Sequence, residues 1–209
     1  VDDLIDVHLH KYQASGAELV MGDGAFLGPR TIRVDLHQGG TRILRGENVV
    51  ICTGSRARID DTSGLKEARP LSHVELLDID HVPPHLIVLG GGYIGLEMAQ
   101  AFRRFGSRVT VVERNDTPIH REDSDVTAAI TSLLLDEGIE LLTRTSVVRV
   151  NGNSGDSVRV HAVRDGTALV LEGTHLLAAA GRIPNTDGIG LQQTGVELDK
   201  QGHVKVNEK

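Results

Sequence analysis

A glycine-rich turn between an apolar run and an amphipathic segment constrains this chain most. Residues 85–89 read His-Leu-Ile-Val-Leu and predict a short buried strand, and Gly90 to Gly95 follow as Gly-Gly-Gly-Tyr-Ile-Gly. Residues 93–105 then predict a helix that ends at Gly106. A strand, a tight turn and a helix in this order are typical of a β-α-β unit in a parallel sheet.

The same alternation of strands and helices continues along the chain. We expect the first helix to bury Ile94, Met98, Ala101 and Phe105, which follow one another at steps of four, three and four residues. The later predicted segments are, in chain order, a strand at 108–112, a helix at 125–137, a strand at 139–142, an antiparallel ribbon at 147–150, 158–163 and 168–171, and a strand at 175–180.

The N-terminal part of the chain has a different pattern, with short alternating segments in place of long periodic ones. We expect a helix at 2–12, an antiparallel meander of strands at 18–21, 31–36 and 41–44, a buried strand at 48–54 and a connection between domains at 56–73. The predicted fold class is therefore α/β: a Rossmann-like parallel sheet with an antiparallel ribbon, plus a partial second domain that contains a β-meander.

The glycine turn and a downstream acid together predict a dinucleotide site. Gly90 permits the tight turn, Gly92 lets the backbone approach a pyrophosphate, and Gly95 lets the helix pack close to the sheet. The helix N-terminus would offer free N–H groups to the phosphates. Glu113 ends the next strand, 18 residues after Gly95, near the spacing of a ribose-binding carboxylate. A carboxylate there repels a 2′-phosphate and favours NADH, whereas the adjacent Arg114 is able to serve NADPH.

Composition excludes several other classes of partner. The formal net charge is −7, which argues against nucleic-acid binding and anionic membranes because both need basic surfaces. The sequence has neither a bilayer-length apolar run nor a signal-peptide pattern, so we expect a cytoplasmic protein without membrane contact. Cys52 is the single cysteine, and the ten histidines, His8 and His10 included, lack the spacing of a metal site.

Two other interpretations of the glycine turn stay open at this point. The turn and Glu113 are also compatible with a tight corner and a solvated strand end that bind nothing. A methyltransferase uses a similar glycine-rich loop and acid, but that hypothesis gives no role to the helix or to the segment Gly181-Arg182-Ile183-Pro184-Asn185.

Four stretches in this order resemble the pyridine nucleotide-disulfide oxidoreductases, which are flavoproteins with two dinucleotide sites. They are residues 49–55 (Val-Val-Ile-Cys-Thr-Gly-Ser), 90–97, 108–114 and 180–185. The likeness covers essentially the whole chain. The runs 106–113 and 121–123 are most similar to the mercuric reductase and dihydrolipoamide dehydrogenase branches.

The resemblance implies that an NAD domain is inserted into an FAD domain. Residues 1–71 would be a partial FAD-binding domain, 72–188 the NAD(P)-binding Rossmann domain, and 189–209 the start of the return to the FAD domain. The run from Gly22 to Phe26 resembles a loop whose backbone meets the flavin adenine, with Asp23 and Gly24 as its contacts. Thr53 and Gly54 would lie beside the FAD pyrophosphate, and Cys52 would be a small buried residue instead of a redox thiol.

The resemblance also assigns the nicotinamide end of the NAD site. Tyr93 would cover the nicotinamide pocket and move aside when the cofactor binds, and Glu97 would lie near it, one turn along the helix. Gly181 would let the backbone approach the ribose or nicotinamide, and Arg182 would reach the flavin side. The residues that the sequence assigns to NAD are Gly90, Gly91, Gly92, Tyr93, Ile94, Gly95, Glu97, Glu113, Arg114 and Gly181.

The activity that the resemblance implies is hydride transfer from NAD(P)H to FAD and then electron transfer to a disulfide or other acceptor. The first FAD-binding glycine motif, the redox cysteine pair and the dimerisation domain are expected outside these 209 residues. We therefore expect no catalytic residue in this chain and a homodimeric whole protein. The alternatives are a non-catalytic NAD-binding or interaction module, and an NADH oxidase or peroxidase with a single redox cysteine upstream.

Overall fold

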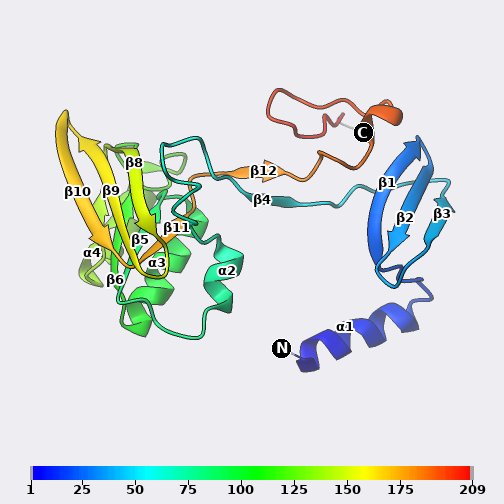
Figure 1. Cartoon of the computed structure of the whole chain (residues 1–209), viewed down its shortest axis with the longest axis horizontal. Coiled ribbons are helices and arrows are strands. Elements are labelled where there is room, and N and C mark those ends of the chain that lie inside the picture. Colours follow the sequence, from blue (N-terminus) through cyan, green and yellow to red (C-terminus); the bar gives the residue numbers. More distant parts are fainter. Residues whose placement is uncertain (1, 208–209) are drawn as a thin grey trace. The chain divides into compact units, whose positions relative to one another are not determined.

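The computed structural model describes residues 2–207 and divides the chain into two compact units (Figure 1). We call Val1–Gly54 with Pro184–Lys209 the meander unit, and Ser55–Ile183 the parallel-sheet unit. The breaks between these compact units fall at other residues than the bounds of the predicted cofactor domains (1–71, 72–188 and 189–209), which stay a prediction. Residues 55–71 pack within the parallel-sheet unit, where Leu65 and Ala68 are buried in its core.

The parallel-sheet unit is built on four parallel strands in the order β11-β5-β6-β7. The strands are β5 (His85–Leu89), β6 (Arg108–Val112), β7 (Glu140–Leu142) and β11 (His175–Ala178). The helices that connect them are α3 (Tyr93–Phe105) and α4 (Ser124–Asp136). These elements confirm the predicted strand–helix alternation: the bounds of β5, α3 and β6 are as predicted, and those of α4, β7 and β11 differ by one or two residues.

Both faces of this sheet are covered, which explains why its strands are almost continuously apolar. One face packs on the helices: Leu86, Val88, Val109 and Val111 share a cluster with Leu96, Ala99 and Phe102 of α3, Leu134 of α4, and Leu76. The other face packs on a three-stranded antiparallel sheet, where Ile87, Leu89, Val112 and Leu176 meet Val150, Val158 and Val160.

The antiparallel sheet is the predicted ribbon, with strands longer than the sequence suggested. Its order is β10-β9-β8. The strands are β8 (Thr145–Asn153), β9 (Ser157–Arg164) and β10 (Thr167–Gly173). Burial alternates along β9, where Val158, Val160 and Ala162 face the core, as expected for a sheet with one solvated face.

The buried face of α3 differs from the prediction, which named Ile94, Met98, Ala101 and Phe105. Gly95, Leu96, Ala99 and Phe102 are buried instead, and Phe105 is 65% exposed. Gly95 is the point of closest approach to the preceding turn, so the residues that follow it by four and seven positions turn toward the sheet.

A short helix, α2 (His73–Asp78), precedes the first parallel strand and was not predicted. Ser72 caps it: the Ser72 hydroxyl accepts from the Val74 N–H, and the Glu75 carboxylate accepts from the Ser72 N–H, which is a capping box. Leu76 of this helix is fully buried. The Ser-x-x-Glu spacing was present in the sequence as a signal for this helix.

The meander unit contains α1 (Asp2–Ala14), the antiparallel sheet β1-β2-β3 and the short 3-10 helix η1 (Leu191–Gln193). The strands are β1 (Gly22–Gly28), β2 (Thr31–Leu36) and β3 (Thr41–Arg45). The predicted strand at 18–21 is wrong, because the first strand begins at Gly22 and pairs with Leu36. Where the chain passes between the units, β4 (Ser55–Ala57) and β12 (Arg182–Pro184) form a two-stranded ribbon.

The predicted buried strand at 48–54 is also wrong. These residues form no strand, Val50 is 81% exposed and Cys52 is exposed. An apolar run becomes a strand only when another strand completes its hydrogen bonds, and within residues 2–207 no strand pairs with this one.

Candidate functional site

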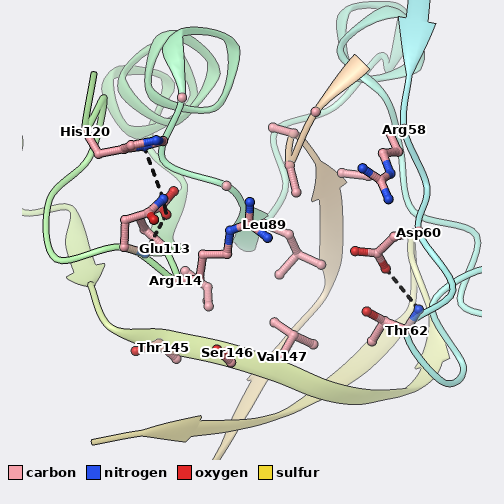
Figure 2. Close-up of a pocket in the computed structure, with 18 of the residues that line it drawn as sticks. Arg58, Asp60, Thr62, Leu89, Glu113, Arg114, His120, Thr145, Ser146 and Val147 are labelled. Carbon is pink, nitrogen blue, oxygen red and sulfur yellow. Dashed lines mark hydrogen bonds between the residues drawn. The ribbon is translucent and has the colours of Figure 1, made fainter. Parts of the chain in front are cut away.

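A pocket of about 570 Å³ opens at the carboxyl ends of the parallel strands (Figure 2). All of its lining residues belong to the parallel-sheet unit. Leu89, Val112 and Ala178 line it from the ends of β5, β6 and β11. In parallel α/β sheets this edge is where loops meet and ligands bind.

The glycine turn forms one wall of the pocket, and two of its glycines are required by packing within the chain. Gly90 has φ +112°, and a Cβ there would lie 2.6 Å from the Ala179 carbonyl oxygen. A Cβ on Gly95 would lie 2.0 Å from the Gly90 carbonyl oxygen. Both contacts are with backbone atoms, which cannot move aside by changing rotamer. A side chain at either position would therefore displace the helix or the strand ends.

Gly92 is different, because nothing in the described part of the chain requires a glycine there. A Cβ added to Gly92 would meet no atom within 4 Å, and the φ of −82° is open to any residue. Gly92 is the N-cap of α3, makes no side-chain cap, and the first turn of α3 contains no acidic residue. The positive end of this helix therefore faces the pocket without a side chain of its own to neutralise it.

Glu113 is buried, with 7% of its surface exposed, and it fastens the glycine turn to the end of β6. Its Oε2 accepts from the Gly91 N–H at 2.7 Å. Its Oε1 accepts from the backbone N–H of Asn115 at 2.8 Å and from the Asn115 Nδ2 at 2.6 Å. The carboxylate thus borders the pocket in a fixed orientation, as charge-assisted hydrogen bonds to two loops hold it there.

Cationic side chains outnumber carboxylates on the pocket wall. Arg58 and Arg114 reach into it from opposite sides in Figure 2, and Arg121 and His120 add to the wall, whereas the carboxylates are Asp60 and Glu113. The Asp60 carboxylate already accepts from the Thr62 N–H at 3.0 Å. This balance suits an anionic ligand, in a protein whose overall charge is negative.

Tyr93 lines the pocket mouth and is 67% exposed. Its hydroxyl donates to Glu122 Oε1, and this hydrogen bond is the main reason that the pKa of Tyr93 is raised. Glu97, one turn further along α3, is exposed and is not among the residues that line the pocket. The structure therefore does not bring Tyr93 and Glu97 to the same site.

Most of the predicted NAD residues come together. Gly90, Gly92, Tyr93, Glu113, Arg114 and Gly181 all line the pocket. Gly91 lies behind them, bonded to Glu113, and Gly95 is buried against Gly90. Ile94 is half-buried in the first turn of α3 and, like Glu97, does not line the pocket.

The predicted flavin-side residues lie outside this pocket. The run that contains Asp23 and Gly24 is part of strand β1, paired with Asp35 and Val34, so the expected loop there is wrong. In the meander unit, the carbonyl oxygens of Thr53 and Gly54 accept from the side-chain amide and backbone N–H of Asn185, each at 3.0 Å.

Arg182, predicted for the flavin side, and Cys52, predicted to be buried, both lie among the described residues. In the ribbon, Arg182 donates from Nε to the Ser55 hydroxyl at 2.7 Å and from its guanidinium to the Ser55 carbonyl oxygen. Cys52, predicted to be buried, is exposed, because its segment forms no strand.

Sequence reasoning missed several residues that complete the pocket. Arg58 lies beside Gly181 because its N–H donates to the Gly181 carbonyl oxygen at 3.0 Å. No local periodicity signals this contact, since it joins segments far apart in the sequence. Asn115 and His120 lie in the loop after β6, where the Asn115 Nδ2 is 3.1 Å from the His120 Nδ1, and an irregular loop has no periodicity that would predict such a contact.

Among residues 2–207, no group of three or more His, Cys, Asp or Glu side chains is arranged to hold a metal ion. In the same part of the chain, no helix has both the length and the apolar character needed to cross a membrane.

The fold and the pocket define an α/β protein with a pocket at the carboxyl edge of a parallel sheet, and comparison with known proteins identifies its family. Residues 8–209 match the family model described as pyridine nucleotide-disulphide oxidoreductase. The chain belongs to this family, which confirms the resemblance drawn from its motifs.

Curated relatives include two of the branches that the motifs suggested. The chain is 37% identical over 204 residues to dihydrolipoamide dehydrogenase of Chaetomium thermophilum, covering 95% of this chain and 40% of that protein. It is 35% identical over 193 residues to mercuric reductase of Streptomyces lividans, covering 92% of this chain and 40% of that protein. The chain therefore spans about two fifths of the length of these relatives.

The solved structures include a flavoprotein of similar fold. The HOCl-induced flavoprotein disulfide reductase RclA from Escherichia coli superposes with a TM-score of 0.84 and is 28% identical. The match covers 99% of this chain and 46% of that one. The mixed α/β fold, with its parallel and antiparallel sheets, is thus similar to the matched part of this flavoprotein disulfide reductase.

Proposed function

We propose that the parallel-sheet unit binds NADH in the pocket at its carboxyl edge, and that it serves as the nicotinamide-nucleotide half of a flavin-dependent oxidoreductase. The observation that carries this proposal is Gly92. Packing explains the other glycines of the turn, but it leaves Gly92 unexplained, since a Cβ there would meet nothing within 4 Å. A pyrophosphate that lies against the backbone at this point would explain why residue 92 is a glycine.

The N-terminus of α3 supports a phosphate at the same place. The amides of its first turn have no partner within the helix, and neither a cap side chain nor an acidic residue competes for them. The adjacent arginines Arg114 and Arg121 add positive charge. A dinucleotide diphosphate satisfies both the helix dipole and these cations.

Glu113 supports NADH over NADPH. Its carboxylate is held at the pocket wall by Gly91 and Asn115, so it is fixed where ribose hydroxyls are able to donate to its remaining lone pairs. A 2′-phosphate at that position would face a buried negative charge, and the side chain of Arg114 would have to compensate for the repulsion.

The whole protein would pass a hydride from NADH to FAD and electrons on to a disulfide or another acceptor. Bound flavin supplies the redox chemistry, and the residues of this chain bind and orient the nicotinamide nucleotide. Asp23, Gly24, Thr53, Gly54 and Arg182 are proposed to lie on the flavin side. Because the chain spans only 40% of the length of its dihydrolipoamide dehydrogenase relative, we expect it to bind FAD weakly and to lack turnover by itself.

Isothermal titration of NADH into the full chain tests the proposal. We expect a single site, and we expect Gly92→Ala to weaken its affinity at least about tenfold, because the new methyl group occupies the space proposed for the diphosphate. Gly28→Ala is the matched control: Gly28 also has no atom within 4 Å of an added Cβ and lies in the meander unit.

The outcome is interpretable only for folded variants, so circular dichroism accompanies each titration. If folded Gly92→Ala binds NADH as tightly as the unchanged chain and Gly28→Ala, the diphosphate does not lie at this turn. If the unchanged chain gives no heat of binding with either NADH or NADPH, the proposal fails entirely.

A further inference from the structure

Two histidines 94 residues apart meet at the edge of the parallel sheet opposite to the pocket. His81 lies between α2 and β5, and His175 is the first residue of β11. Their Nε2 atoms are 3.2 Å apart, and their rings are tilted by 58° with centroids at 5.2 Å. His175 is 4% exposed, whereas the side chain of His81 is 54% exposed, so solvent reaches the pair from one side.

The second ring nitrogen of His175 contacts a threonine. Its Nδ1 is 3.0 Å from the Thr174 Oγ1, and that hydroxyl is also 3.0 Å from the His85 carbonyl oxygen. The hydroxyl has one hydrogen and two lone pairs, so it serves His175 as donor or as acceptor according to which ring nitrogen carries the proton. When Nδ1 carries the proton, Nε2 presents a lone pair toward His81.

His81 has an acidic neighbour. Its Nδ1 is 3.0 Å from the Asp80 Oδ1, and an ionised carboxylate only accepts hydrogen bonds. The Nδ1 of His81 therefore donates, and in the neutral ring its Nε2 presents a lone pair. The two Nε2 atoms lie at a hydrogen-bond distance of 3.2 Å, so a cation that displaced the proton between them would be bound by both nitrogens.

We propose that His81 and His175 form a binding site for a divalent cation of the Zn²⁺ class. Zinc–imidazole bonds of about 2.0–2.1 Å at a tetrahedral angle place two nitrogen ligands roughly 3.3 Å apart, close to the observed separation. In metal sites, a ligating histidine usually donates its other N–H to a carboxylate or another oxygen. Asp80 and Thr174 already occupy those positions.

The site would be open and exchangeable. Within residues 2–207 no third His, Cys, Asp or Glu side chain joins such a group, so water or a small anion would complete the coordination. The ion would link the loop after α2 to the start of β11, and this link stabilises the parallel-sheet unit by mass action. The two histidines do not line the pocket proposed for the dinucleotide, so this proposal is independent of the proposed function.

Titration of ZnCl₂ into the full chain, followed by calorimetry and thermal unfolding, tests the site. At a Zn²⁺ concentration ten times the dissociation constant, we expect the melting temperature to rise by about 3–5 °C and to return after chelation. His81→Ala, at an exposed position, should weaken Zn²⁺ binding at least about tenfold. His37→Ala, an exposed histidine of the meander unit, is the control and should bind as the unchanged chain does.

A positioning role for Asp80 gives a second test. Asp80→Asn should weaken Zn²⁺ binding roughly 10–100-fold, the usual cost of removing an outer partner of a ligating histidine, while NADH affinity stays unchanged in both Asp80→Asn and His81→Ala. Equal Zn²⁺ binding by His81→Ala and the unchanged chain would overturn the proposal.

Histidine ¹⁵N spectra of the full chain provide a readout that does not depend on affinity. Zn²⁺ should shift the Nε2 resonances of His81 and His175 together, and in the metal-bound state both rings should carry their proton on Nδ1. A proton that stays on either Nε2 at saturating Zn²⁺, or Zn²⁺-induced shifts confined to other histidines, would refute the site.

Discussion

Replacing Gly95 by alanine should displace the glycine turn from its packing on the sheet. The added Cβ would lie 2.0 Å from the Gly90 carbonyl oxygen, 3.2 Å from its carbon and 3.3 Å from the Ala179 Cβ. Restoring an ordinary contact of at least 3.4 Å requires α3 to move by about 1.4 Å, because the opposing atoms are backbone. That movement also loosens Leu96, Ala99 and Phe102 in the core.

Overpacking of this kind costs about 1–3 kcal/mol, and the loosened core places Gly95→Ala at the upper end, near 3 kcal/mol. With a urea dependence of roughly 2 kcal/mol per molar, the midpoint of unfolding should fall by about 1.5 M. The chain has no tryptophan, so far-ultraviolet circular dichroism is the appropriate probe.

Gly92→Ala provides the contrast on the same turn. Its Cβ would meet no atom within 4 Å, and exchanging glycine for alanine at an N-cap costs no more than about 1 kcal/mol. If Gly95→Ala keeps its midpoint within about 0.3 M of the unchanged chain, or if Gly92→Ala is destabilised equally, then the packing argument for the glycine turn is incorrect.

Three other predictions follow from individual contacts. Glu113→Gln should lower the preference for NADH over NADPH, measured as the ratio of the two dissociation constants. The substitution removes the buried negative charge while keeping the size of the side chain. An unchanged ratio would show that Glu113 is not part of the ribose site. Ser72→Ala should lower the free energy of unfolding by about 1 kcal/mol, because it removes the cap of α2; urea denaturation that shows no loss would mean that the cap contributes nothing. Partial burial, with a smaller contribution from Arg108, holds the pKa of His85 below its ordinary value of 6.5. As the pH falls, the unfolded chain therefore takes up the proton before the folded chain does. The stability that the neutral His85 contributes is complete above pH 6.5 and is lost as the pH falls through the lowered pKa. His85→Gln should therefore show a shallower loss of unfolding free energy below pH 6.5 in urea titrations, and an identical slope would contradict the assignment.

The sequence predicted best where one local pattern decides the structure. The bounds of β5 and α3 and the end of the helix at Gly106 are as predicted, because an apolar run, a glycine turn and a helical period agree there. The predicted buried face of α3 was displaced by about one residue, because Gly95, and not an apolar side chain, makes the closest contact with the preceding turn.

Predictions failed where a segment depends on partners elsewhere in the chain. Residues 48–54 have the composition of a buried strand, but they find no strand to pair with among residues 2–207. Glu113 lines the pocket, but its role as a ribose-binding residue stays a prediction. Sequence reasoning did not reveal its bond to Gly91, which requires β5 and β6 to be neighbours. The approach of His81 to His175 depends in the same way on β11 lying beside β5.

A crystal structure of the full chain with NADH tests the central claim most directly. The account predicts the diphosphate against Gly92 and the first amides of α3, and the adenine ribose beside the Glu113 carboxylate. NADH bound anywhere outside the pocket, or a pocket that stays empty at saturating NADH, would contradict it.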